Sequence, residues 1–313
     1  MQAERLAFSL YLCYNMGNIK SGLGDVPDEC SEFVGFGRVF LSRQKSFPSR
    51  NAPYLMEIIM KKLPYKHKVC VAAHRGDSAH KAENTREAFA AAIACGCDMI
   101  ETDVHLTKDD VPVLIHDETV DRTTNGFGLV SDFTYEELRK LNCNPDGDFS
   151  EIPTLDEFLQ LAVENDVMID LEIKEYNRDK NKNRCRLCVE KTIETVEKYN
   201  WAEKTVINSF DAYVLEYTDE ISKGKYKLHG FYPYSMMSNV SRNPDEYLYC
   251  ACIFDDRNYD CYDYLRKQGI EPWAGAKVKT KEHFAECSAL GAVVFTSNDP
   301  ETAMKYLEEL KRR

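Results

Sequence analysis

From Lys68 onward, short apolar runs alternate with amphipathic segments, and this alternation restricts the fold more than any other feature of the chain. Such alternation predicts parallel strands joined by right-handed helical crossovers. Eight strand candidates and six helix candidates follow this order. The strands are expected at 69–74, 98–104, 167–173, 204–209, 226–232, 249–254, 270–275 and 292–297, and the helices at 85–94, 184–199, 211–222, 258–267, 280–289 and 300–311. The fold class is therefore α/β, a closed TIM (β/α)8 barrel.

The length agrees with one large domain plus an extension, because a barrel of this type commonly needs about 250 residues. We expect the barrel domain at 61–313 and an N-terminal extension at 1–60, which has turn-forming patches and no clear period. The extension is either weakly ordered or the product of a wrongly assigned start, with translation beginning at Met56 or Met60. Deleting residues 1–55 is expected to leave turnover unchanged.

The alternation breaks once, between the second and third barrel strands, where about 60 residues replace a single crossover. We interpret 111–116 as an extra strand and 117–150 as a small insertion. An insertion at this point would overhang the C-terminal face of the barrel, where barrel enzymes carry out their chemistry. Two helix starts carry the spacing of a capping box, Asn84 with Glu87 and Thr154 with Glu157.

Composition narrows the choice of partners and compartment. The formal net charge of −12 argues against nucleic acid and anionic membranes as partners, since both select for basic patches. No apolar run approaches the roughly 20 residues of a membrane span, and we expect no transmembrane segment. The 12 cysteines are expected to be free thiols in a cytoplasmic protein, because disulfide frameworks belong to small secreted chains. The sequence leaves the oligomeric state open.

Carboxylates gather where the second and third barrel strands end. Glu101 and Asp103 share one face of their strand, and Glu172 ends the next barrel strand with Lys174 two positions later. Three carboxylates in one barrel mouth would repel one another unless a cation balances them. One hard divalent cation with oxygen ligands, Mg²⁺ or Ca²⁺, fits this set.

Two histidines and an arginine follow strands in the same part of the chain. His74 and His116 indicate a general base and a general acid, because imidazole titrates near neutral pH. Arg75 offers a planar fork of donors suited to a phosphate, and Lys174 offers a point charge. This combination is typical of a metal-assisted phosphoryl-transfer site. No glycine-rich phosphate loop, dinucleotide fingerprint or serine nucleophile elbow stands in its required context.

From about Val69 to the end, the chain resembles the glycerophosphodiester phosphodiesterases, a branch of the phosphatidylinositol-phospholipase-C-like barrel phosphodiesterases. The resemblance rests on several motifs in the family's order, namely His74-Arg75-Gly76, Glu83-Asn84-Thr85, Glu101-Thr102-Asp103, Ile115-His116-Asp117, Asp121-Arg122-Thr123-Thr124-Asn125-Gly126, Leu171-Glu172-Ile173-Lys174, Asn208-Ser209-Phe210, Trp273 and Thr296-Ser297-Asn298-Asp299-Pro300.

The resemblance implies a role for each matching residue. It makes Glu101, Asp103 and Glu172 the metal ligands, His74 and His116 the acid and base pair, and Arg75 and Lys174 the phosphate contacts. Glu83 would support the first histidine and arginine, and Trp273 would close one pocket wall against the glycerol moiety. The chain departs from the family at Asp110, at 274–276 and at 292–293, and the last two changes are expected to alter the pocket wall.

The predicted function is metal-dependent hydrolysis of glycerophosphodiesters, small-molecule substrates, to glycerol 3-phosphate and an alcohol by histidine acid/base catalysis. Two alternatives remain: a lysophospholipase D-like phosphodiesterase, which would need an apolar groove beside the barrel mouth, and a catalytically silent barrel that binds phosphodiesters. The residues do not assign base and acid between the two histidines. They also do not distinguish water from the substrate's 2-hydroxyl as nucleophile, Mg²⁺ from Ca²⁺, or one head group from another.

Overall fold

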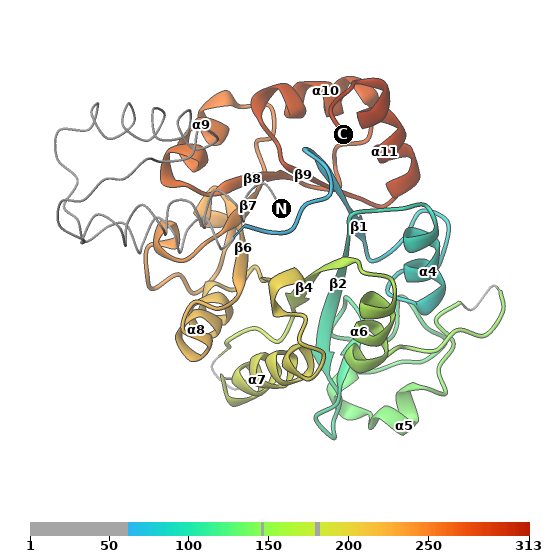
Figure 1. Cartoon of the computed structure of the whole chain (residues 1–313). Helices are drawn as coiled ribbons and strands as arrows, with labels where there is room; N and C mark the ends of the chain where they lie inside the picture. The colour runs from blue at the N-terminus through green and yellow to red at the C-terminus, as the bar shows by residue number, and fades with distance from the viewer. Residues whose placement is uncertain (1–61, 145–146, 179–181) are drawn as a thin grey trace, which may run out of the picture. The chain divides into compact units, whose positions relative to one another are not determined.

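Eight parallel strands close into a barrel in the computed structural model, which describes residues 62–144, 147–178 and 182–313 (Figure 1). The predicted N-terminal extension lies outside these residues. The barrel strands are β1 (Cys70–His74), β2 (Met99–Leu106), β4 (Met168–Ile173), β5 (Thr205–Asn208), β6 (Lys227–Tyr232), β7 (Cys250–Ile253), β8 (Glu271–Ala274) and β9 (Val294–Ser297). Each pairs in parallel with its neighbours, and β1 pairs with both β9 and β2, which closes the barrel. The predicted (β/α)8 barrel is confirmed.

Helices surround the strands in chain order (Figure 1). They are α4 (Arg86–Ala94), α6 (Leu155–Glu164), α7 (Lys182–Lys198), α8 (Ala212–Ser222), α9 (Tyr259–Gln268), α10 (Lys281–Leu290) and α11 (Pro300–Glu309). Between β6 and β7 the described chain forms two short 3-10 turns, η4 (Tyr234–Met236) and η5 (Pro244–Glu246), in place of an α-helix.

One of the two predicted helix starts is confirmed and the other is wrong. Thr154 caps α6 with a capping box completed by Glu157. At α4 the cap is Thr85, whose hydroxyl accepts a hydrogen bond from the amide of Ala88, and not Asn84. Asn84 adopts a left-handed conformation with φ of 57° and is buried, so its side chain is directed to the barrel interior instead.

The interior of the barrel has an apolar layer beneath a polar one. Alternate strand residues face inward, and nearest the amino ends of the strands they form an apolar cluster. The cluster consists of Leu63, Cys70, Ala72, Met99, Met168, Val206, Cys250, Trp273 and Val294. The following inward positions on the same strands are His74, Glu101 and Asp170. Polar side chains therefore begin where each strand approaches the carboxyl end of the barrel.

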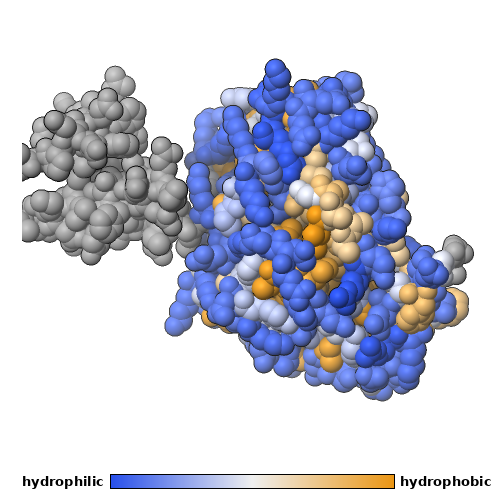
Figure 2. All heavy atoms as spheres, turned by 45° about the vertical axis from the view of Figure 1, so that its right-hand side comes forward, coloured by the Kyte–Doolittle hydropathy of each residue, from blue (hydrophilic) through white to orange (hydrophobic). Residues whose placement is uncertain are grey.

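The segment between β2 and α6 contains its own small core. The predicted extra strand is β3 (Pro112–Leu114), which pairs antiparallel with β2. After it come η2 (Val130–Asp132) and the single turn α5 (Tyr135–Leu138), packed around buried Val120 and Leu138. Phe127 and Phe149 in this segment are 81% and 60% exposed. The face drawn in Figure 2 is mostly hydrophilic, with apolar residues gathered in a limited patch.

The described part of the chain bears on two predictions, that the cysteines are free thiols and that no transmembrane segment is present. Ten of the cysteines are described, and all ten are free thiols. Cys185 and Cys188 lie fully buried on α7, so the helix face they share is packed into the core. Within residues 62–144, 147–178 and 182–313, no helix has both the length and the apolarity needed to span a membrane.

Candidate active site

Three carboxylates converge inside the carboxyl end of the barrel. Glu101 and Asp103 lie on β2, and Glu172 lies on β4, where it is the register partner of Asp103. Each offers an oxygen, and the three oxygens lie within 4.8 Å of one another. All three residues are buried, at 5% exposure or less. The predicted metal-ligand set is therefore brought together in one place.

Lys174 partly balances this acidic cluster from within. Its Nζ lies 2.6 Å from Oε1 of Glu172 and 3.1 Å from Oδ1 of Asp103. Oε1 of Glu101 is buried and has no hydrogen-bond partner. Because an unpaired buried carboxylate oxygen is costly, the cluster fits an additional cation at Glu101, and its oxygen donors suit a hard divalent ion.

The pKa values of the three carboxylates shift in different directions. Burial, followed by the charges of Asp103 and Glu172, raises the pKa of Glu101 well above its ordinary value. Burial also raises the pKa of Glu172, against the opposing effect of Lys174. For Asp103, burial acts upward, but Lys174 and Arg75 outweigh it and the pKa is lowered. Without a metal, Glu101 is therefore the carboxylate of the cluster that most readily retains a proton.

Both predicted catalytic histidines face the same cavity, and each is held through Nδ1. Nδ1 of His74 lies 2.6 Å from Oδ1 of Asn298, and Nδ1 of His116 lies 2.5 Å from Oδ1 of Asp117. An amide or carboxylate oxygen can only accept, so Nδ1 carries the proton in both rings. This tautomer leaves Nε2 of each neutral ring with a free lone pair.

Burial gives the two rings little tendency to hold a second proton. It is the main reason that the pKa of His74 falls to about 4, and Arg75 acts in the same direction. Burial also lowers the pKa of His116, although Asp103 and Asp117 oppose this change. His74 is therefore neutral at pH 7, whereas His116 has a carboxylate partner that stabilises a positive charge on its ring.

The guanidinium of Arg75 is held by two carboxylates. Its Nη1 donates to Oε1 of Glu83 at 2.9 Å, and its Nε lies 3.2 Å from Oδ2 of Asp103. The backbone of Arg75 is left-handed, with φ of 59°, and its amide donates to Glu101. Glu83, which was predicted to support the first histidine and arginine, thus contacts Arg75 directly.

A second arginine, Arg122, extends this network to His116. Arg122 donates to both oxygens of Glu83 and, through Nε at 2.6 Å, to Oδ2 of Asp117. Glu83 therefore connects Arg75 to Arg122, and Asp117 connects Arg122 to His116. Arg75 and His116 are thus linked through one continuous set of charged hydrogen bonds.

The cavity above these residues has a volume of about 360 Å³. One side is polar, with His74, Arg75, Glu101, His116 and Lys174. Other lining residues are apolar, namely Phe210, Phe231, Cys252, Ile253, Phe254, Gly275 and Ala276. The rings of Phe210 and Phe231 are stacked with centroids 3.4 Å apart, and Phe254 meets both edge-on. The cavity therefore joins an anion-binding half to an aromatic half.

Trp273, the segment 274–276 and the segment 292–293 differ in whether they line the cavity. Trp273 is fully buried in the apolar layer against His229 and does not line the cavity, so it supports the site from below. Its side chain lies in the apolar layer beneath the cavity, so it does not form the pocket wall that was expected. Gly275 and Ala276 do line the cavity, as the departures at 274–276 suggested, whereas 292–293 do not. Asp110 adopts the left-handed turn conformation, with φ of 60°.

Four residues in the site were given no role from the sequence. Asn84 donates to Asp103 at 2.8 Å and accepts from Thr102, and Asn298 holds His74. Asp170 and His229 line the cavity floor, where Nδ1 of His229 lies 2.8 Å from Oδ2 of Asp170. The strand parity of Asp170 with Glu172 was a usable signal. For His229, only closure of the barrel shows which residues lie opposite it.

A closed parallel barrel with two opposed imidazoles, an arginine, a lysine and three buried carboxylates at its carboxyl end has the architecture of a barrel phosphodiesterase. The chain belongs to the glycerophosphoryl diester phosphodiesterase family, whose family model matches residues 74–252. The resemblance predicted from the motifs is thereby confirmed.

Two relatives illustrate the similarity in sequence. The glycerophosphodiester phosphodiesterase of Caldanaerobacter subterraneus subsp. tengcongensis is 44% identical over 158 residues, which cover 47% of this chain and 60% of the relative. The glycerophosphodiester phosphodiesterase 1 of Bos taurus is 38% identical over 133 residues, covering 41% of this chain and 38% of the relative. The matched segments thus span less than two thirds of these relatives' lengths.

Solved structures agree with the barrel. A glycerophosphodiester phosphodiesterase from Thermotoga maritima superposes with a TM-score of 0.60 at 25% identity, covering 77% of this chain and 99% of that one. A phosphodiesterase from Oleispira antarctica, solved in complex with sn-glycerol-3-phosphate, has a TM-score of 0.66 at 20% identity and covers 79% and 97% of the two chains.

Proposed function

We propose that this chain is a metal-dependent phosphodiesterase that hydrolyses glycerophosphodiesters to glycerol 3-phosphate and an alcohol. One observation carries the proposal: two imidazoles held through Nδ1 line the same cavity as Arg75, Lys174 and a buried carboxylate cluster. Family membership and the named activity of the relatives support it.

The partners of the two histidines suggest how they divide acid and base roles. Asn298 is neutral and does not stabilise an imidazolium, so His74 stays unprotonated with its Nε2 lone pair available, and we assign it as the general base. Asp117 is a carboxylate, so it stabilises a protonated His116, which is the better general acid. In this assignment the neutral His74 removes the proton from the attacking oxygen, and His116 enters the step as an imidazolium, held by Asp117, and gives its Nε2 proton to the leaving alkoxide.

The charged residues around the cavity bind and orient the phosphate. Arg75, held by Glu83 and Asp103, presents a fixed fork of donors, and Lys174 adds a positive charge from the opposite side of the carboxylates. Glu101, Asp103 and Glu172 would hold one Mg²⁺ or Ca²⁺, which supplies Lewis-acid polarisation of the phosphate oxygens when bound. Asn84 and Lys174 fix the orientation of Asp103 through hydrogen-bonding and ion-pair contacts.

The decisive experiment measures glycerol 3-phosphate release from glycerophosphocholine and glycerophosphoethanolamine, in chelator, Mg²⁺ or Ca²⁺. Metal-dependent release that is lost in Glu101→Ala supports reaction, cofactor and site together. Transient glycerol 1,2-cyclic phosphate would identify the 2-hydroxyl as nucleophile, whereas turnover of a substrate analogue that lacks the 2-hydroxyl would identify water. No release from either substrate with any metal would refute the proposal.

The aromatic half of the cavity favours a second candidate substrate, a lysophospholipid. Phe210, Phe231 and Phe254 with Ile253 form an apolar wall of the kind that an acyl chain needs. Comparing choline release from lysophosphatidylcholine and from glycerophosphocholine separates the two. A kcat/KM ratio that favours the lysolipid, and that falls in Phe231→Ser, would assign the wall to the acyl chain.

A further inference from the structure

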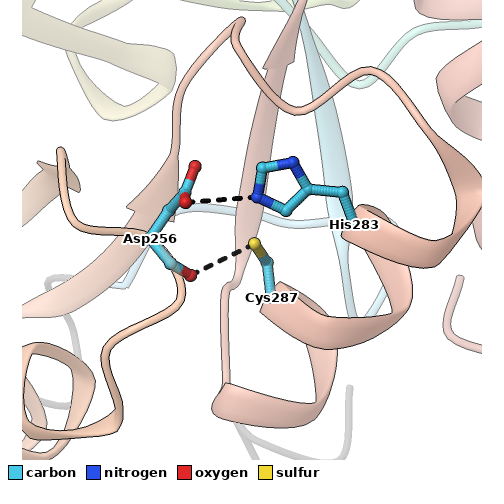
Figure 3. Close-up of side chains that lie close together, drawn as sticks. All are labelled: Asp256, His283 and Cys287. Carbon is cyan, nitrogen blue, oxygen red and sulfur yellow. Dashed lines mark hydrogen bonds and ion pairs between the residues drawn. The ribbon is translucent and has the colours of Figure 1, made fainter.

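A second cluster of metal-binding side chains lies away from the carboxylates of the candidate active site. It consists of Asp256, in the loop after β7, and of His283 and Cys287 on α10 (Figure 3). His283 and Cys287 are four positions apart, which places them on the same face of the helix. The close-up shows both side chains directed at the Asp256 loop.

The donor atoms are close to the arrangement that a tetrahedral ion requires. Nε2 of His283 lies 3.1 Å from Oδ1 of Asp256, and one ligand atom from each of the three residues falls within 4.8 Å of the others. Bonds of about 2.0–2.3 Å to zinc imply ligand-to-ligand distances of roughly 3.3–3.8 Å. Small side-chain rotations would therefore complete the set.

Burial adds an independent observation. Asp256 is 5% exposed, and its Oδ2 is buried without a hydrogen-bond partner. Its nearest cation is Nζ of Lys277, at 3.6 Å, beyond ordinary hydrogen-bonding distance. Lys277 is about half exposed and its ammonium also donates to the backbone carbonyl of Phe254, so it keeps a partner when another cation takes its place at Asp256. A buried carboxylate oxygen left in this state is suited to a metal ion.

We propose that Asp256, His283 and Cys287 form a zinc site, with water in the fourth position, that joins the loop after β7 to α10. The donor set of one sulfur, one nitrogen and one oxygen selects zinc-like ions over Mg²⁺ and Ca²⁺, which prefer oxygen alone. Carboxylate and thiolate together carry two negative charges, which balance Zn²⁺ while the imidazole stays neutral.

The protonation state of Cys287 makes binding depend on pH. Its thiol donates to the backbone carbonyl of Asp256 at 3.3 Å, so the sulfur carries a proton before a metal binds. Metal binding must therefore release this proton, because the thiolate is the ligand. Zinc affinity is expected to rise with pH across the neutral range and to be measurable as proton release in weakly buffered solution.

The test uses cobalt as a spectroscopic substitute for zinc in the chelator-treated full chain, with excess Mg²⁺ present to occupy oxygen sites. One equivalent of Co²⁺ should give thiolate-to-cobalt charge-transfer absorption, which one equivalent of Zn²⁺ abolishes. The absorption should disappear in Cys287→Ser and in His283→Gln. Cys261→Ser, which changes a half-buried cysteine on α9, is the matched control and should retain it.

Absence of the charge-transfer band in the unaltered protein, or its persistence in Cys287→Ser, would overturn the proposal. Circular dichroism of each variant verifies the fold. If Cys287→Ser does not fold, His283→Gln decides, because the His283 side chain is 14% exposed and tolerates an amide of similar reach. A band retained in folded His283→Gln likewise overturns the site.

Discussion

Nδ1 of His74, at the end of the first barrel strand, lies 2.6 Å from Oδ1 of Asn298, in the loop after the last strand. The two residues are 224 positions apart, and only barrel closure brings them together. Asn298 fixes the tautomer of His74 without touching the reacting atoms, so it acts as a positioning residue.

Asn298→Ala should lower kcat by about tenfold to a hundredfold, the usual range for removing such a supporting hydrogen bond. KM should change little, because Asn298 does not line the cavity. Steady-state kinetics and the pH profile of kcat check this expectation, with Asn298→Asp as a variant that retains an acceptor oxygen. A loss confined to KM would show that Asn298 contacts substrate instead.

His74→Ala and His116→Ala should each lower turnover by at least about a hundredfold. The two variants should differ when the leaving group is 4-nitrophenolate, which departs without protonation. This substrate should largely restore turnover in His116→Ala, where only the general acid is missing, and should not restore it in His74→Ala. The reverse pattern would exchange the two roles.

Metal binding should stabilise the folded protein as well as support its turnover. At a concentration of one hundred times Kd, a ligand specific for the folded state adds about 2.7 kcal/mol to the free energy of unfolding. Thermal melts in chelator, Mg²⁺ and Ca²⁺ measure this gain, and Glu101→Ala should abolish it. Equal melting temperatures with and without metal would contradict the assignment of Glu101, Asp103 and Glu172 as ligands.

Glu101→Gln should stabilise the metal-free protein at neutral and alkaline pH while abolishing turnover. The raised pKa of Glu101 means that the folded state binds more protons than the unfolded state above about pH 4.5. Stability of the unaltered protein therefore falls as pH rises through this region, and the variant lacks that loss. Melting temperatures in chelator at pH 5 and pH 8 should show a larger advantage for the variant at pH 8.

Gly76→Ala should destabilise the protein by at least about 2 kcal/mol. Gly76 has φ of 79°, and an added Cβ would lie 2.6 Å from the backbone carbon of Ala88. Urea unfolding measures the change, with Gly269→Ala as the control: its φ of 81° is similar, but no atom lies within 4 Å of its added Cβ. Equal losses in both variants would attribute the effect to backbone conformation alone.

The agreement between sequence and structure is closest where information is local. Eight apolar runs that alternate with helical periodicity are typical of buried parallel strands. Seven of the eight barrel strands lie within their predicted ranges, and β2 extends two residues beyond its range. Strand parity also placed Glu101, Asp103 and Glu172 inward. Asn84 shows where a local rule fails: its capping spacing is correct, but the buried Asp103 and Thr102 recruit its side chain.

The sequence by itself determined the barrel and the family and predicted the residues of the catalytic set, because these depend on periodicity and on motifs only a few residues long. The tertiary structure decided which residues complete the site. The pairs His74–Asn298 and Asp170–His229, the inner position of Trp273 and the cluster of Asp256, His283 and Cys287 all join different elements. The physical reason is that strand tilt and barrel closure determine which side chains meet. Neither can be predicted from the spacing of residues along a single strand.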